Sequence, residues 1–139
     1  MKLPDSMLVN ADRTSDGAAC ALLDFPKVLD TATDNRLACT GGQFQFRGPI
    51  GTAEMYWLNA DSMQQFPHED WDQYVERANR EVRIAFDKIC SVTDFDAEAA
   101  KWGHIREAIE SGKITDPTEH LYFVAYFSPE PTKAQEVSP

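Results

Sequence analysis

The sequence predicts an α+β fold: an antiparallel meander sheet, made of three strands plus a C-terminal strand, with two helices packed on one face. Three observations support this fold class. Short alternating runs flank Gly41-Gly42, an apolar repeat of helical period extends from Trp71 to Ile89, and an unbroken apolar run covers Leu121 to Phe127. Strands first, helices next and a closing strand are the order expected of an α+β layer.

The front of the chain contains a short apolar run, Ala18 to Phe25, which meets Pro26. Proline ends most helices, so one interpretation of this run is a short helix. A strand over Ala18 to Leu23 fits nearly as well, because periodicity alone does not separate the two in short apolar runs. The sequence therefore leaves the secondary structure of residues 1–35 open.

Two glycines, Gly41 and Gly42, separate the next two alternating runs, 36–40 and 43–46. Glycines supply the positive φ angles that a two-residue hairpin turn requires, so the pattern predicts a hairpin with its turn at this pair. Gln43 and Gln45 then share its polar face. A second turn over residues 48–51 leads into a third strand from Ala53 to Leu58, which completes a meander.

A long helix is expected after this sheet, with Pro67 as its first residue and acidic residues in its opening turns. Its core face repeats every three or four residues over five turns. The predicted core residues are Trp71, Tyr74, Val75, Ala78, Val82, Ala85, Phe86 and Ile89.

A second helix is expected from Thr93 or Asp94 to Gly112, a residue type common just past helix ends. The closing strand, 121–127, is apolar on both faces: Leu121, Phe123, Ala125 and Phe127 face one way, and Tyr122, Val124 and Tyr126 the other. The second face of this strand must be sealed by the N-terminal segment or offered to a partner.

Length and composition indicate one globular α+β domain over residues 1–128, followed by a flexible, proline-rich tail over 129–139. The 139-residue chain is 42% hydrophobic and 11% aromatic, which excludes disorder over most of its length. Its start lacks the apolar run of a signal peptide, and no stretch is long enough to span a bilayer. We therefore expect a cytoplasmic protein that does not contact membranes.

The net charge of −10 makes direct binding of nucleic acid unfavourable, because phosphate contacts need clustered lysines and arginines. The same charge favours a protein partner with a basic surface. Cys20, Cys39 and Cys90 are widely spaced and have neither a disulfide nor a zinc-site pattern, so reduced packing thiols are expected.

No motif in the chain predicts a catalytic residue, a metal site or a cofactor. The densest group of ligand-type residues, 68–72, points around most of one helical turn, so at most two of its side chains can converge on one ion. Gly41-Gly42 lacks the lysine and the following helix of a phosphate loop. The sequence therefore favours a protein that is not an enzyme.

The outward side of the long helix is one candidate partner-binding surface. An outward isoleucine lies there among charged residues, and a stripe of acids runs beside it. The alternative is a solvated, self-neutralising helix face. The residues of this candidate site are Glu69, Asp72, Glu76, Arg80, Ile84 and Asp87.

The spare face of the closing strand, made by Tyr122, Val124 and Tyr126, is a candidate for self-association as a homodimer. Together these features predict a small acidic cytosolic protein that acts by protein–protein interaction. Size and charge would suit an inhibitor of a basic nucleic-acid-binding protein, of the kind that phages and mobile elements use against host defences. The alternative is a small-molecule-binding or enzymatic α+β domain with a pocket between helices and sheet.

Overall fold

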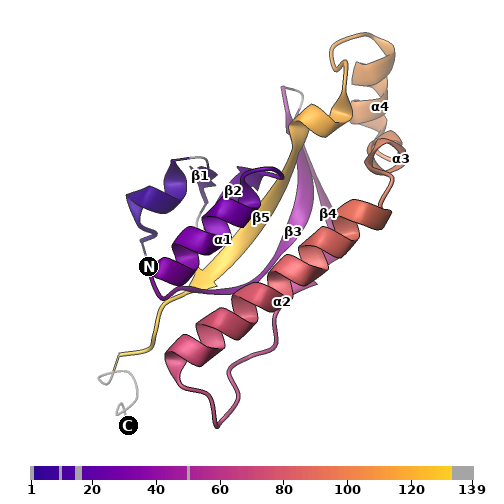
Figure 1. Ribbon diagram of the computed structural model, residues 1–139. Coiled ribbons are helices and arrows are strands. Elements are labelled where there is room, and N and C mark those ends of the chain that lie inside the picture. The colour runs from indigo at the N-terminus through magenta and orange to yellow at the C-terminus, as the bar shows by residue number, and fades with distance from the viewer. Residues whose placement is uncertain (1, 10, 15–16, 50, 133–139) are drawn as a thin grey trace, which may run out of the picture.

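The last strand of the chain is the central strand of the sheet. The computed structural model describes residues 2–9, 11–14, 17–49 and 51–132. Its single antiparallel sheet has the strand order β1-β2-β5-β3-β4 (Figure 1). The strands are β1 (Ala11–Arg13), β2 (Gly17–Ala21), β3 (Ala38–Gly48), β4 (Gly51–Asp61) and β5 (Leu121–Ser128).

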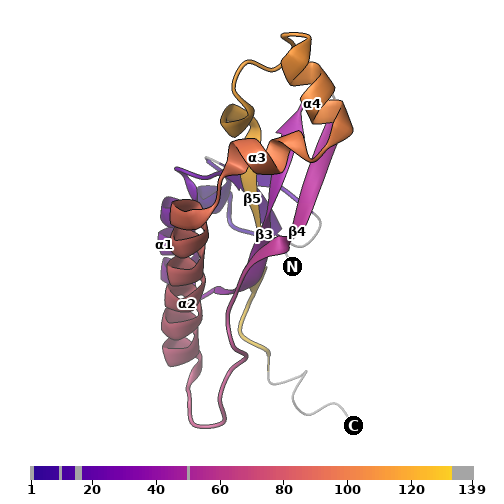
Figure 2. The same cartoon turned by 90° about the vertical axis from the view of Figure 1, so that its right-hand side faces the viewer.

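Both long helices, α1 (Phe25–Asp34) and α2 (Trp71–Val92), lie on the same side of this sheet (Figure 2). The 3₁₀ helix η1 (Asp5–Leu8) lies on this side as well, and its buried Met7 packs into the same core. Two short helices, α3 (Phe95–Ala100) and α4 (Gly103–Glu110), and a second 3₁₀ helix, η2 (Pro117–His120), form a lobe at one end. The α+β class is confirmed, with five strands and four α-helices instead of four strands and two helices.

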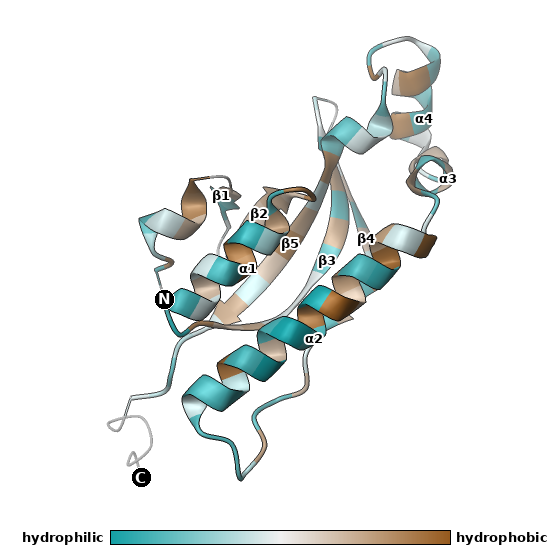
Figure 3. Ribbon diagram, in the orientation of Figure 1, coloured by the Kyte–Doolittle hydropathy of each residue, from teal (hydrophilic) through white to brown (hydrophobic). Residues whose placement is uncertain are grey.

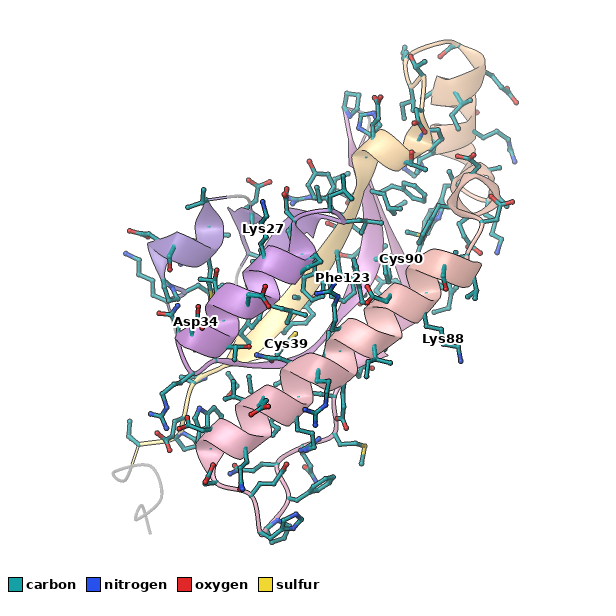
Figure 4. The ribbon with its side chains drawn as sticks, in the orientation of Figure 1. Lys27, Asp34, Cys39, Lys88, Cys90 and Phe123 are labelled. Carbon is teal, nitrogen blue, oxygen red and sulfur yellow. The ribbon has the colours of Figure 1, made fainter. Side chains whose placement is uncertain are left out.

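The core lies between β5 and the two long helices. Phe123 of β5 is fully buried, and its ring centroid lies 4.5 Å from that of Phe25 on α1 and 5.1 Å from that of Phe86 on α2. Figure 4 shows Phe123 beneath these helices. Leu121, Ala125 and Phe127 share its face, so the predicted division of this strand into two faces is confirmed. Burying a side chain of this size contributes roughly 1.5–3 kcal/mol.

The predicted hairpin at Gly41-Gly42 is wrong, because both glycines lie inside the single long strand β3. Gly42 is opposite Ala125, and a β-carbon built on it would lie 2.5 Å from the Val124 carbonyl oxygen and from the Phe123 ring. This glycine therefore permits close packing against β5, not a reversal of the chain. The second predicted turn is confirmed, since β3 and β4 form a hairpin closed by the pair Gly48 and Gly51.

The apolar run after residue 17 is a strand and not the short helix first considered. Its residues pair with the closing strand, with Ala19 opposite Val124, so pairing across the sheet decides what local periodicity left open. Pro26 lies in the first turn of α1, where its missing N–H costs nothing, and it therefore begins a helix instead of ending one.

The long helix is confirmed, although it begins at Trp71 and not at Pro67. Asp70 caps it: the Asp70 carboxylate accepts the Gln73 N–H at 2.8 Å, and the Gln73 side chain accepts the Asp70 N–H at 2.9 Å. This capping box places the cap three residues after the proline and the first helical residue four after it. Its core-facing residues are buried, apart from Ala85 and Ile89, which are partly buried against the core. Figure 3 shows the resulting alternation of hydrophobic and hydrophilic positions along α2.

The expected second helix is divided into α3 and α4. Asp94 caps α3 and Gly112, at φ +79°, follows α4, so both predicted ends are confirmed. Trp102 interrupts the helix in an extended conformation, with its ring stacked 6.2 Å from the ring of Trp57 on β4. We attribute the break to this packing: stacking the Trp102 ring on Trp57 stabilises the fold more than the helical hydrogen bonds that are lost at this residue.

One buried polar side chain ties α1, α2 and β3 together. The Asn79 amide oxygen on α2 accepts the Cys39 N–H at 2.7 Å. The amide nitrogen donates to the Thr33 hydroxyl at 2.8 Å and to the Leu37 carbonyl at 3.1 Å. Every polar atom of this amide is satisfied, which is the condition for burying it without a large cost.

Candidate binding surface

The face of the sheet that points away from the helices is the first candidate surface, here called the open face. Directly opposite residues in an antiparallel pair share a face. Val124 is opposite Ala19 and Gln43, and Tyr122 is opposite Gln45, which is in turn opposite Glu54. In Figure 2 the long helices lie on the other side of the sheet. By this pairing the open face carries Asp12, Ala19, Gln43, Gln45, Arg47, Glu54, Asp61, Tyr122, Val124 and Tyr126. Tyr56, two residues after Glu54 on β4, is exposed beside them.

The centre of the open face is apolar and aromatic. Val124 is only 6% exposed, because its neighbours on the same face surround it, whereas Tyr122 and Tyr126 on either side of it are half-buried. Tyr56 on the edge strand β4 is 62% exposed. Tyrosine offers a large apolar ring and a polar tip, a combination enriched in protein interfaces.

One half of the open face contains an arginine with its own partners. The Arg47 guanidinium carbon lies 5.5 Å from the centre of the Tyr122 ring, within the range of a cation–π contact. Its Nη1 lies 3.6 Å from a carboxylate oxygen of Asp12 on β1. This cation thus lies between the aromatic ring of the adjacent strand β5 and a carboxylate of β1, on the far side of β2.

The other half contains carboxylates and tyrosines. Gln45 donates to Glu54 at 3.3 Å, and a hydrogen bond with Glu54, together with the charge of that carboxylate, raises the pKa of Tyr56. Asp61 on β4 and Tyr126 on β5 both pair with Gly41, so they flank the same position of β3. This half is negatively charged.

A bulge in β4 shapes this edge of the sheet. Met55 is opposite Phe44 and Asn59 is opposite Gln43, so three residues of β4 lie between neighbouring partners on β3. Bulges increase local twist and redirect side chains. Here Tyr56 is exposed at the bulge, while Trp57 contacts the lobe and donates to Glu98 at 3.0 Å.

The second candidate surface, the outward side of α2 with Glu69 before it, carries fewer unpaired acids than its sequence suggests. The Glu69 side chain is 8% exposed and is held by Arg77 through N–O distances of 2.6 and 2.8 Å. This pairing lowers the Glu69 pKa to about 2. The Arg77 guanidinium also donates to the carbonyls of Met63 and Gln64, so the pair fixes the loop before α2.

Two other acids of that surface also pair within the chain. Asp72 accepts from Arg36 at 2.7 Å, and Asp87 from Arg83 at 3.1 Å. Glu76, Arg80 and Ile84 are exposed, Ile84 by 63%. Five of the six residues lie on α2, whereas Glu69 precedes the helix, because the cap at Asp70 starts it later than predicted. Three of the four carboxylates are already paired with arginines.

The described cysteines are poorly suited to nucleophilic chemistry. Cys20 and Cys39 are buried, and burial raises the pKa of each thiol to about 12. Partial burial raises the pKa of Cys90 to about 11. At neutral pH these groups remain protonated thiols, which are weak nucleophiles.

The interior between helices and sheet is filled by aromatic rings, which leaves little room for the pocket of the alternative hypothesis. A small, partly open cavity between the lobe and the β3–β4 hairpin measures about 10 Å³ and is lined mainly by apolar residues, including Phe46, Ile105 and Ile114. Within the described ranges no three His, Cys, Asp or Glu side chains converge as metal ligands. None of the helices described is long and apolar enough to cross a membrane.

The sequence-based candidates missed most of the open face. Tyr122, Val124 and Tyr126 were identified from the doubly apolar run, and the shared face of Gln43 and Gln45 from alternation. Arg47, Asp12 and Asp61 were not identified as parts of one surface, because they join it only through the order of the strands. The strand order depends on long-range pairing that no local signal in the sequence encodes.

Comparison of the chain with family models, with curated proteins and with solved structures finds no match.

Proposed function

We propose that this protein acts by protein–protein interaction, and that the open face of its sheet binds a partner with a basic surface. The observation that carries the proposal is the contrast between the two faces: helices cover one, while the other bears tyrosines around a central valine. Antiparallel sheets commonly leave one face to solvent, but such faces are usually polar. Three tyrosines and a valine on this face favour a binding role instead.

The size of the open face suits a protein partner. The five strands differ in length, from three residues in β1 to 11 in β3 and β4, and average about eight. At a spacing of about 4.8 Å they make a surface of about 600 Å² before side-chain relief is counted. A standard protein interface buries about 800 Å² on each partner. The open face together with its rim is of this order.

Charge favours a basic partner over a second copy of the chain. The chain carries −10, and Asp12, Glu54 and Asp61 lie towards the edges of the open face. A two-fold axis through Val124, along or across β5, would bring Glu54 of one copy near Asp12 or Asp61 of the other. Like charges placed opposite each other oppose association.

Inhibition of a nucleic-acid-binding protein is the finer form of this proposal. Such a protein must present clustered lysines and arginines to phosphates, and an acidic protein can occupy that cluster. The support for this form is charge alone, whereas the support for a protein-binding role is the open face.

Affinity capture with three baits tests the proposal. The baits are the unaltered chain, an open-face variant (Tyr122→Ser with Tyr126→Ser) and a helix-face variant (Arg80→Ser with Ile84→Ser), each applied to lysate of the organism that carries the gene. We expect a basic protein that the first and third baits retain and the second loses. Retention by all three, or loss with the helix-face variant alone, would contradict the proposed site.

A further inference from the structure

We infer that the basic partner adds an extended segment to the free edge of β4, along residues 51–55, with a lysine or arginine opposite Glu54. This inference rests on the proposed function and describes how the same partner is recognised. Unpaired main-chain groups of β4 provide the binding edge, and the charge of the strand selects the occupant.

β4 is the last strand of the sheet, so β3 is its one neighbour (Figure 1). In an antiparallel pair, every second residue of an edge strand turns its N–H and C=O groups away from its neighbour. Among the described residues, one hydrogen bond outside this pairing reaches the main chain of β4, and the Asn59 side chain donates it to the Tyr56 carbonyl. The outward groups of residues 51–55 are therefore available to another extended chain.

The two edges of the sheet differ in how they are protected against such pairing. β1, at one edge, has three residues and includes Arg13, whereas β4 has 11 and contains no lysine, arginine or proline. Short length, basic side chains and proline are common means of preventing an edge strand from pairing with another chain. β4 has a bulge instead, and because the bulge follows Met55, residues 51–55 pair with β3 in regular register.

The start of β4 is also accessible. Gly51 and Thr52 are exposed, and a β-carbon built on Gly51 meets no atom within 4 Å. The lobe contacts the strand through Trp57, within the bulge, and it approaches Gly51 across the small cavity described above. Ala53 and Met55 are buried in the core, so an added strand would continue both faces of the sheet without displacing them.

The charge of this segment favours a basic occupant. Glu54 lies on the open face, and it forms no ion pair with a described residue. Opposite charges on directly opposite residues of neighbouring strands stabilise the pairing, and like charges destabilise it. A lysine or arginine opposite Glu54 is therefore favoured, whereas the net charge of −10 opposes the approach of a second copy of the chain.

The test is a titration of the ¹⁵N-labelled full chain with two synthetic peptides of equal length and charge, one of alternating threonine and lysine and one of alternating proline and lysine. Threonine favours an extended strand and keeps its N–H group, whereas proline has none to donate. Amide chemical shifts locate the binding site and give the affinity. Amide hydrogen exchange shows which N–H groups become hydrogen-bonded.

Two variants accompany the unaltered protein. Glu54→Lys places a like charge opposite the lysines of the peptide. Asp34→Lys makes the same change in net charge at an exposed position of α1, which Figure 4 labels. The comparison of the two peptides on the unaltered chain does not depend on the folding of either variant.

We expect the threonine–lysine peptide to shift the amides of residues 51–55 and to slow hydrogen exchange at alternate positions among them. The proline–lysine peptide should bind at least about tenfold more weakly, because it cannot complete the hydrogen-bond ladder. Glu54→Lys should weaken binding of the first peptide about tenfold and Asp34→Lys by less than about threefold, since the first change alone reverses a cross-strand charge pair.

Absence of binding by the threonine–lysine peptide, equal affinity for the two peptides, shifts confined to other elements, or equal losses in the two variants would overturn the inference. The proposed function is tested separately by affinity capture. If the peptide fails to bind β4 while the open-face variant still loses its partner in that experiment, the added strand is wrong and the proposed function stands.

Discussion

The two faces of the sheet differ in whether their polar side chains have partners within the chain. On the helical side the buried amide of Asn79 has all its hydrogen bonds, and the charge of Glu69 is matched by Arg77. On the open face Asp12 pairs with Arg47, whereas Glu54 and Asp61 on the edge strand β4 form no ion pair with a described residue. The polar groups of the helical side complete the fold, whereas those of the open face remain available to a partner.

The largest expected effect compares neighbouring aromatic residues of β5. Phe123→Ala should lower the free energy of unfolding by about 3–5 kcal/mol, because it empties the centre of the core. Tyr126→Ala, on the open face, should cost only about 1–2 kcal/mol, since its ring is half-buried. Urea unfolding measures both, and equal costs would mean that the open face is core.

The next effect tests whether buried polar groups on the helical side are structural. Asn79→Ala leaves the Cys39 N–H and the Leu37 carbonyl without this partner, so we expect a loss of about 2–4 kcal/mol. The matched control is Glu76→Ala, an exposed position on the same helix, which should change stability by less than about 0.5 kcal/mol. A small loss at Asn79 would show that water can replace the amide.

The Glu69–Arg77 pair predicts a pH dependence. The folded-state pKa of Glu69 is about 2, below its ordinary value of 4.5, so the pair contributes stability above about pH 4.5 and loses it as the pH falls towards 2. Glu69→Gln should flatten the decline in unfolding free energy over that range. Unfolding curves from pH 2 to 6 measure it; identical slopes for the two proteins would show that the pair is not formed in solution.

The smallest effects should come from two glycines outside both faces. A β-carbon on Gly48 makes ordinary contacts of 3.6 Å or more with His120 and Ile114 beside the small cavity, and one on Gly103 meets nothing within 4 Å. Gly48→Ala and Gly103→Ala should each stabilise the chain by about 0.4–1 kcal/mol, chiefly by restricting the unfolded state. Thermal unfolding measures the gain. Gly42→Ala, which would overlap β5, is the control that should destabilise.

Elements with a strong local signal were predictable from the sequence. The long helix has an apolar repeat over five turns, and the closing strand has an unbroken apolar run, so both were identified with their correct faces. The hairpin predicted at Gly41-Gly42 is wrong, because glycine suits a hairpin turn and close packing inside a strand equally well. The local sequence contains no information about which of the two applies, since the difference is the presence of Phe123 and Val124 on β5.

The binding surface was predictable only in part, for a related reason. Three of its residues lie on one strand, where alternation reveals them. The remainder come from β1, β3 and β4, and they join only because the last strand is inserted between β2 and β3. Conversely, the sequence contains the acidic residues predicted to form a stripe along the long helix, but Glu69, Asp72 and Asp87 each pair with an arginine of the same chain.

The most direct test of the account is the native mass of the full chain and of its Val124→Lys variant, measured under non-denaturing conditions at several concentrations. If the open face is free for a heterologous partner, both proteins are monomers of 15.6 kDa and the variant is still folded. A dimer of the unaltered chain that Val124→Lys converts to a folded monomer would contradict the account, because the open face would then belong to a second copy.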